Sequence, residues 1–170
     1  MSEKRFALIG HPLGHSMSPF LHDRLFAAAG VSASYELIDT APKHLPETVR
    51  RLREYDGFNI TIPYKEAVMP FLDEVDEKAS FFGSVNTVRN ENGRLTGHTT
   101  DGDGFLFALA AAGVTAMDRV LLLGSGGASQ TVQAVLRAQG AEVVVISRRG
   151  PVTYDMIEQH ADARLVVNAT

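Results

Sequence analysis

The sequence predicts an α/β protein with two sheets, because short apolar runs of strand length alternate with segments of helical periodicity. Two of these runs, Phe6 to Ile9 and Gly57 to Thr61, lie in the first hundred residues. A third, Arg119 to Leu123, stands directly before a glycine-rich turn. Short apolar runs that stop abruptly are typical of buried parallel strands. We therefore expect a mainly parallel sheet in the first part of the chain and a second parallel sheet after residue 119.

Helix-start and turn signals divide the first part of the chain. Ser18 is expected as a helix N-cap with Pro19 at the first helical position. The helix that follows carries Leu21 and Leu25 on one face, and Gly30 stops it. By the same reasoning, helices are expected over 42–55 and 74–82, and strands over 34–38, 84–89 and 94–97, with an Asn92-Gly93 turn between the last two.

The second part of the chain has the element order of a Rossmann-type, doubly wound nucleotide-binding fold. We expect a linking helix over 101–112, strands over 119–123, 142–146 and 165–167, and a helix over 130–138. Such a fold usually has about six strands, so these amount to roughly half of one. The predicted domains are 1–103 and 104–170, the second being partial and ending in mid-fold. The open sheet edge invites disorder, dimerisation or domain swapping, so a homodimer is one of the expected outcomes.

Composition narrows the function classes. The 170 residues carry a formal net charge of −4, with 45% hydrophobic and 21% charged residues, which is typical of a folded globular protein. The acidic balance argues against nucleic-acid binding, and the absence of cysteine excludes disulfides and thiolate chemistry. The apolar run near the N-terminus is too short for a signal peptide or a membrane span, so we expect a cytoplasmic protein without membrane contact.

The glycine-rich turn between the 119–123 strand and the next helix indicates a dinucleotide site. Its residues are Gly124, Ser125, Gly126, Gly127, Ala128 and Ser129. Ser129 stands where a third glycine or alanine is usual, and its small side chain still permits close helix packing. Backbone N–H groups in such a turn, together with the N-terminus of the helix, suit a pyrophosphate.

The end of the next predicted strand indicates which dinucleotide is bound. Ser147, Arg148 and Arg149 stand there, about 20 residues beyond the glycine turn, where an NAD-specific fold has an acidic side chain for the ribose hydroxyls. Arginine is instead a bidentate partner for a 2′-phosphate. We therefore expect NADP rather than NAD. The alternative is a pair of solvated arginines in a loop.

Two serines at the start of the first predicted helix indicate a carboxylate site. The hydroxyls of Ser16 and Ser18, with the free N–H groups of a helix N-terminus, suit a carboxylate ligand. The alternative is that Ser18 only caps the helix. His11 and His15 have the i, i+4 spacing of metal ligands, but the proline and glycine between them preclude a helix that would hold both on one face. No metal site is expected.

Lys65 is a candidate general acid/base. It follows the 57–61 strand in the first turn of a short helix, where the helix dipole disfavours a cation. The dipole and burial both lower a lysine pKa, which is the direction that proton transfer at neutral pH needs. The alternative is an exposed surface lysine.

Asn86 and Asp101 are candidate substrate contacts. Asn86 offers a donor and an acceptor to a polyol. Asp101 offers a carboxylate at a helix entry, and the alternative is that it is an ordinary N-cap.

Taken in order, these stretches resemble the shikimate dehydrogenase family. The segments that carry the resemblance are GHPLGHSMSP, GFNITIPYKE, GSVNTV, TTDG, LLLGSGGAS, SRR and VVNAT. The resemblance implies a shikimate-binding substrate domain followed by the first half of an NADP-binding domain. It also implies reversible NADP-dependent reduction of 3-dehydroshikimate to shikimate, within chorismate and aromatic amino-acid biosynthesis.

The resemblance further implies roles for individual residues. Lys65 is the catalytic acid/base, paired with Asp101, and Glu77 lies near the nicotinamide. The implied substrate contacts are Ser16 and Ser18 on the carboxylate, and Thr61, Asn86 and Asp101 on ring hydroxyls. The implied cofactor contacts are Gly124, Ser125, Gly126, Gly127 and Ala128 on the pyrophosphate, and Ser147, Arg148 and Arg149 on the 2′-phosphate.

The sequence departs from the family pattern in three places. Asp23 and Thr99 each stand where the family usually has asparagine, and both leave the implied contact residues intact. After Thr170 the family continues through the rest of the nucleotide domain and back into helices that complete the substrate domain. Two alternatives stay open: a quinate/shikimate dehydrogenase of broader specificity, and a truncated, non-catalytic substrate-binding fragment.

Overall fold

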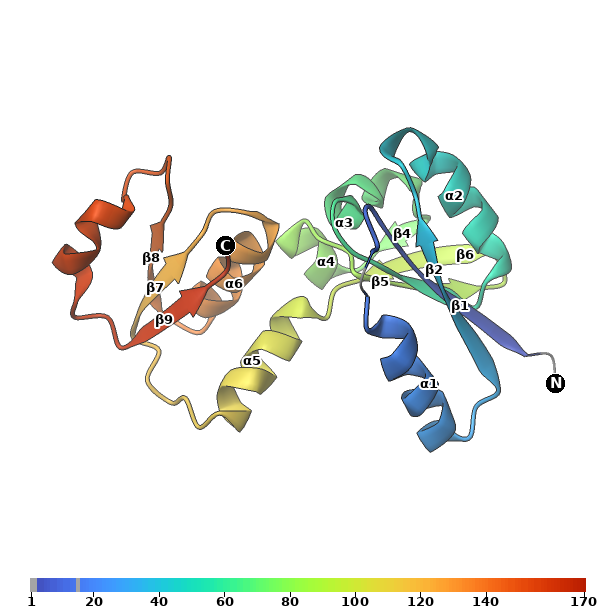
Figure 1. Cartoon of the computed structure of the whole chain (residues 1–170), viewed down its shortest axis with the longest axis horizontal. Helices are drawn as coiled ribbons and strands as arrows, with labels where there is room; N and C mark the ends of the chain where they lie inside the picture. Colours follow the sequence, from blue (N-terminus) through green and yellow to red (C-terminus); the bar gives the residue numbers. More distant parts are fainter. Residues whose placement is uncertain (1–2, 15) are drawn as a thin grey trace. The chain divides into compact units, whose positions relative to one another are not determined.

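The computed structural model describes residues 3–14 and 16–170 and confirms the α/β class (Figure 1). The chain divides into two compact units, Met1–Thr99 and Thr100–Thr170. The sequence predicts a boundary near residue 103, and the division falls just before the helix that begins at Asp101. Within the described residues, no helix is long and apolar enough to cross a membrane.

The first unit is built on a six-stranded sheet with the strand order β2-β1-β3-β5-β6-β4. Strand β1 pairs in parallel with β2 and β3, and β4 pairs in parallel with β6, whereas β3–β5 and β5–β6 are antiparallel. The sheet is therefore mixed, with parallel pairs in the majority. Its strands are β1 (Lys4–Gly10), β2 (Ala33–Asp39), β3 (Gly57–Ile60), β4 (Glu74–Val75), β5 (Thr87–Glu91) and β6 (Arg94–His98).

Helices cover both faces of this sheet. The chain passes from β1 to β2 in one direction along the sheet and from β2 to β3 in the other, so right-handed crossovers put the two connecting segments on opposite faces. Figure 1 shows α1 and α2 on opposite sides of the strands. The helices are α1 (Ser18–Ala29), α2 (Leu45–Arg51), α3 (Tyr64–Ala67) and α4 (Glu77–Phe82), with 3₁₀ turns η1 (Pro42–His44), η2 (Leu52–Glu54) and η3 (Met69–Phe71).

Two predicted helices were wrong in extent. The 42–55 segment is divided into η1, α2 and η2, because Pro46 in the first turn of α2 has no N–H with which to continue a helix from η1. In the 74–82 segment, Glu74–Val75 pairs with β6 as a strand, and the helix begins only after Asp76. The Asp76 side chain accepts a hydrogen bond from the Ala79 N–H at 2.6 Å, which caps α4 at this point.

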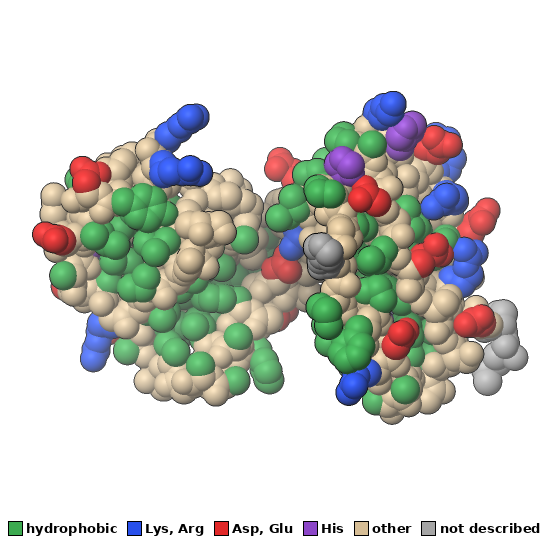
Figure 2. Space-filling model, in the orientation of Figure 1, with side chains coloured by type: hydrophobic (Ala, Val, Ile, Leu, Met, Phe, Trp, Pro, Cys, Tyr) green, Lys and Arg blue, Asp and Glu red, His purple; other side chains and the backbone are tan. Residues whose placement is uncertain are grey.

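The start and the inner face of α1 also differ from expectation. The N-cap is Met17 rather than Ser18, which is already the first helical residue. Leu21 and Leu25 are 53% and 60% exposed, and Figure 2 shows apolar side chains on the surface around the start of α1. The face toward the sheet instead carries His22, which stacks on Tyr35 with ring centroids 3.9 Å apart, and Phe26, which stacks on Phe6.

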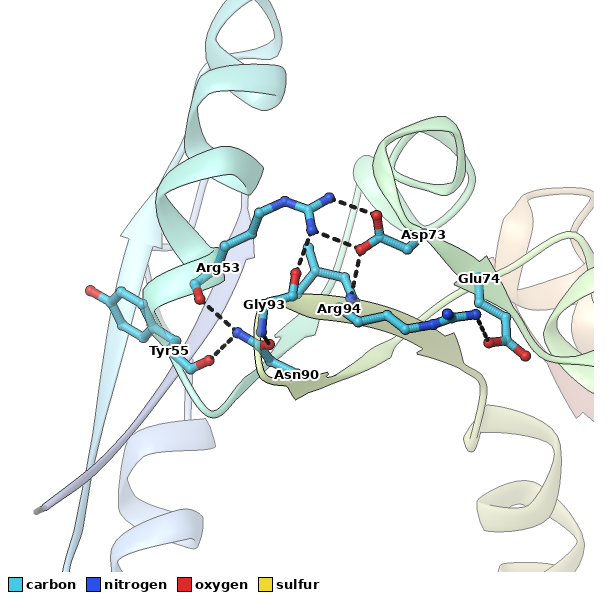
Figure 3. A network of polar contacts seen from close by, with 8 residues as sticks. Arg53, Tyr55, Asp73, Glu74, Asn90, Gly93 and Arg94 are labelled. Carbon is cyan, nitrogen blue, oxygen red and sulfur yellow. Dashed lines mark hydrogen bonds and ion pairs between the residues drawn. The ribbon is translucent and has the colours of Figure 1, made fainter.

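A polar network fastens the β5–β6 hairpin to the rest of the first unit (Figure 3). The Arg53 guanidinium donates to the Asp73 carboxylate at 2.7 Å and to the Gly93 carbonyl, and Asp73 also accepts from the Leu95 N–H. The Asn90 amide donates to the carbonyls of Arg53 and Tyr55. The hydrogen bond from Arg53 is the main cause that lowers the pKa of Asp73, so this carboxylate stays ionised and holds the turn at neutral pH.

The second unit contains the three predicted parallel strands. Their order is β8-β7-β9, with β7 in the centre, and α6 packs against β7 and β8. Val120, Leu122 and Leu136 are fully buried in its core. The elements of this unit are α5 (Asp101–Ala111), β7 (Arg119–Leu123), α6 (Gly127–Ala138), β8 (Glu142–Ile146), the 3₁₀ helix η4 (Tyr154–His160) and β9 (Leu165–Asn168).

We predict that Gly10→Ala lowers the free energy of unfolding by about 1 to 3 kcal/mol, which is the usual effect of overpacking. A Cβ at Gly10 would lie 2.5 Å from Thr61 Cγ2, 2.7 Å from Leu13 Cδ2 and 3.0 Å from the Ile62 carbonyl oxygen. Urea denaturation measures the change. The matched control is Gly14→Ala, whose Cβ would meet no heavy atom within 4 Å. Equal destabilisation by both variants would contradict the packing argument.

Candidate functional site

The segments that carry the predicted substrate residues of the first unit leave one edge of its sheet. Parallel pairing places Gly10 opposite Asp39 and Ile9 opposite Ile60, so β1, β2 and β3 all end at this edge. The antiparallel strand β5 begins here with Thr87, and β6 ends here with His98. In open α/β sheets, ligands bind at the edge where the parallel strands end.

The serine-bearing loop, residues 11–17, leaves β1 at this edge and leads into α1. The Ser16 hydroxyl accepts a hydrogen bond from the Ser18 N–H at 3.2 Å, and both serines are partly exposed. Because Met17 is the N-cap and makes no side-chain cap, the expected alternative in which Ser18 acts as the N-cap is wrong. His15, the second residue of the predicted metal-ligand spacing, lies outside the described residues.

A chain of hydrogen bonds runs from Ser18, at the start of α1, through Tyr35 and Asn59 to Asn86. The Tyr35 hydroxyl donates to Asn59 Oδ1 at 2.8 Å. Burial raises the pKa of Tyr35 to about 12, against a smaller lowering by a hydrogen bond with Ser18, so the phenol is neutral at physiological pH. The Asn59 amide donates in turn to the Asn86 carbonyl at 3.2 Å and to Thr87 Oγ1 at 3.1 Å.

Thr61 follows β3 directly, and Lys65 and Asn86 lie on segments that hydrogen bonds hold to the same edge. The Thr61 N–H donates to the Ile9 carbonyl at 2.9 Å, and Lys65 is a half-buried residue of α3. The Lys65 carbonyl accepts from the Val85 N–H at 2.8 Å, which fastens α3 to the segment before Asn86. The Asn86 side-chain oxygen accepts from the Thr87 hydroxyl at 3.0 Å, so the orientation of this amide is set locally.

Glu77 and Asp101 belong to different units. Glu77 is exposed and opens α4, directly after Asp76, whose carboxylate lies 2.7 Å from His98 Nδ1 at the end of β6. Asp101 is a half-buried residue of the second unit, where it is the first residue of α5. The N-cap of α5 is Thr100, so the alternative of Asp101 as an N-cap is wrong. In the part of the chain that the structure describes, no group of three or more His, Cys, Asp or Glu could hold a metal ion.

The glycine-rich turn of the second unit has a backbone that lets other chain segments and a ligand come close to it. Gly124 has a φ of 110°, and a Cβ there would lie 2.5 Å from the Ala169 carbonyl oxygen. A Cβ at Gly126 or Gly127 would meet no heavy atom within 4 Å, so this stretch is open to a ligand. Helix α6 begins at Gly127, three residues earlier than predicted, and its first turn therefore lies within the motif.

Ser129 joins the two sides of this turn. Its side chain is 2% exposed, and its hydroxyl donates to the Gly124 carbonyl at 2.6 Å. A residue in the place of the usual third glycine thus packs closely and also supplies a donor to the turn. No local sequence pattern indicates this bond, because it depends on how α6 returns over the end of β7.

The segment after β8 carries two exposed cations. Ser147 is buried and its N–H donates to the Val152 carbonyl, whereas Arg148 and Arg149 are exposed. Within the described residues, neither guanidinium takes part in an ion pair. A cavity of about 600 Å³ is lined by Ser125, Ser129, Ser147 and Gly150, and also by Arg119 and Glu142 at the start of β7 and β8; neither Arg148 nor Arg149 is part of its lining. It extends along β8 from the glycine turn to the start of the strand.

Solved dehydrogenase structures share this arrangement of elements. The chain superimposes on shikimate 5-dehydrogenase from Thermus thermophilus, solved in complex with NADP(H) and shikimate, with a TM-score of 0.88 and 40% identity over 98% of this chain and 68% of that one. Shikimate dehydrogenase from Aquifex aeolicus gives a TM-score of 0.93 at 32% identity, over 99% of this chain and 69% of the other.

Sequence comparison leads to the same family. The shikimate dehydrogenase substrate binding domain matches residues 8–88. The NADP(+)-dependent shikimate dehydrogenase of Thermus thermophilus is 40% identical over 177 residues, which cover 98% of this chain and 67% of that relative. The chain therefore belongs to the shikimate dehydrogenase family and spans about two thirds of the length of this relative.

We predict that Ser129→Ala destabilises the protein by roughly 1 to 3 kcal/mol, because the buried Gly124 carbonyl loses its hydroxyl donor. Thermal and urea unfolding measure the loss. The control is Ser125→Ala, at an exposed position in the same turn, and it should change stability by less than about 0.5 kcal/mol. A Ser129 variant as stable as the control would mean that the hydroxyl does not support the turn.

Proposed function

We propose that the protein carrying this sequence is an NADP-dependent shikimate dehydrogenase that interconverts 3-dehydroshikimate and shikimate. One observation carries the proposal: Thr61 and Asn86, from two separate segments, lie with Lys65 at one sheet edge, and the loop that leaves this edge leads to Ser18 at the start of α1. Membership of the shikimate dehydrogenase family supports it, as does the relative that was solved with NADP(H) and shikimate.

In the proposed substrate site, one group of residues binds the carboxylate of the ligand and another binds its ring hydroxyls. Ser16 and Ser18 hydroxyls bind the carboxylate, because hydroxyl donors at the start of a helix favour an anion. Thr61 and Asn86 bind ring hydroxyls, since both side chains can donate and accept. The hydrogen-bonded chain through Tyr35 and Asn59 supports both groups and holds their spacing.

The proposed proton transfer belongs to Lys65. In the reductive direction its Nζ donates a proton to the substrate carbonyl oxygen, which becomes a hydroxyl, and in the oxidative direction the amine takes that proton back. Asp101 is the proposed partner that orients the lysine. When bound, NADP(H) supplies hydride transfer to and from the ring carbon.

The second unit contains residues that fit NADP. The open backbone at Gly126 and Gly127, at the N-terminus of the 12-residue helix α6, suits a pyrophosphate. Arg148 and Arg149 are exposed and make no ion pair among the described residues, so they can take the 2′-phosphate, while Ser147 completes that end of the cavity. Glu77 is the proposed neighbour of the nicotinamide.

We predict that Lys65→Ala, in the protein that carries this sequence, lowers kcat by roughly 10²- to 10⁴-fold with a small change in KM, which is the usual contribution of general acid/base catalysis. Steady-state assays with shikimate and with quinate measure the effect and the substrate preference together. Lys43→Ala, at an exposed lysine of η1, is the control. A near-normal kcat for the Lys65 variant would mean that Lys65 is not the general acid/base.

We predict that Arg148→Ala weakens NADPH binding while NADH binding changes little, because only the 2′-phosphate distinguishes the two cofactors. Titration of each reduced dinucleotide by fluorescence gives the two dissociation constants. Arg164→Ala, at a side chain 66% exposed in the same unit, provides the control. Equal weakening of both cofactors would assign Arg148 to the pyrophosphate or to the loop itself.

A further inference from the structure

We propose that Asp39, which lies outside the set of substrate residues, is a positioning residue that holds the serine-bearing loop for carboxylate recognition. This inference rests on the proposed function. Both oxygens of the Asp39 carboxylate contact the loop: Oδ1 lies 2.6 Å from His11 Nδ1, and Oδ2 accepts from the Leu13 N–H at 2.9 Å. An ionised carboxylate only accepts, so His11 Nδ1 carries the hydrogen in this pair.

The position of Asp39 follows from the sheet register. It is the last residue of β2 and lies opposite Gly10, the last residue of β1, so its side chain meets the loop where the loop leaves the sheet. The hydrogen bonds from His11 and from the Leu13 N–H lower the pKa of Asp39, which keeps the carboxylate charged at neutral pH. Charge-assisted hydrogen bonds of this kind are stronger than those between neutral groups.

Further contacts anchor the described part of this loop. The His11 N–H donates to the Ile62 carbonyl at 3.0 Å, and the buried Leu13 side chain packs beside Gly10. Asp39 adds two contacts, one to the His11 side chain and one to the Leu13 N–H, on either side of Pro12. Without them the loop would sample more conformations, and the fraction with the Ser16 hydroxyl placed for a carboxylate would fall. The apparent dissociation constant rises as that fraction falls.

Thr40, the residue directly after β2, contacts the segment that carries Lys65 instead. Thr40 is buried, its N–H donates to the Gly10 carbonyl at 3.0 Å, and its own carbonyl accepts from the hydroxyl of the buried Tyr64, the residue before Lys65. The end of β2 thus holds the serine-bearing loop through the Asp39 side chain and holds α3 through the Thr40 backbone. Loss of the Asp39 carboxylate should therefore affect substrate binding and leave proton transfer intact.

The test compares Asp39→Ala and Asp39→Asn with Asp56→Ala in the protein that carries this sequence. Asp56 is a matched control, because its carboxylate also accepts a backbone N–H, from Arg5 at 2.8 Å, at the opposite edge of the sheet. Asparagine retains an oxygen that can accept from Leu13. The readouts are hydrogen exchange of the Leu13 amide, and kcat and KM for shikimate at saturating NADP.

We expect Asp39→Ala to speed exchange at the Leu13 amide by about 10-fold or more, and to raise KM for shikimate by roughly 3- to 30-fold with kcat within about 2-fold, as loss of a competent conformation requires. Asp39→Asn should recover part of both effects, and Asp56→Ala should leave both unchanged. The partial recovery separates a specific anchor from general damage to the fold.

Unchanged exchange at Leu13 would overturn the proposal, and so would faster exchange with an unaltered KM. A fall in kcat without a rise in KM would overturn it as well, because the loop would then act on catalysis rather than on binding. Absence of shikimate binding by the unsubstituted protein would overturn the proposed function and the carboxylate part of this inference. The exchange result would still decide whether Asp39 holds the loop, so the two failures are distinguishable.

Discussion

Strand β1 pairs in parallel with both β2 and β3, and the rest of the first unit depends on this pairing. Because three strands then end at one edge, the loop after Gly10, the corner at Asp39 and the segment after Ile60 are brought side by side. The antiparallel hairpin adds the start of β5 to the same edge. Backbone hydrogen bonds therefore fix the spacing of segments whose candidate residues are up to about 70 positions apart.

In each unit, a glycine at or directly after the end of the first strand lies so close to its neighbours that a side chain would not fit: Gly10 in the first unit and Gly124 in the second. At Gly10 the obstacle to a side chain is the threonine, leucine and carbonyl that pack over it, whereas at Gly124 it is the Ala169 carbonyl together with a positive φ. In both places the chain leaves a strand and enters a loop that precedes a helix. The absence of a Cβ lets those loops stay close to the sheet, where the helix N-terminus can act on an anion.

Charged and polar groups at the first sheet edge fall into two kinds. Some are candidates to touch a ligand, and others hold those candidates in place: Tyr35 and Asn59 link Ser18 to the Asn86 segment, Asp39 holds the serine-bearing loop, and Asp76 caps α4 beside His98. Each of these supporting side chains makes at least two hydrogen bonds, which leaves it little rotational freedom. Because these groups are already ordered, less of the binding free energy is lost in ordering the protein when a ligand binds.

The sequence alone determined the α/β class, all three strands of the second unit and the glycine turn, because apolar runs and turn residues are local signals that burial and backbone sterics enforce. It could not determine which face of α1 packs inward, since His22 and Phe26 are chosen over Leu21 and Leu25 by their partners Tyr35 and Phe6, about ten or more residues away in the chain. It also missed the strand at Glu74–Val75, whose pairing partner lies in β6. Tyr35 and Asp39 stand in no motif, and Asn59 stands in the GFNITIPYKE segment without an assigned role. Only the tertiary structure decided the contacts of these three residues, because strand register sets which side chains meet.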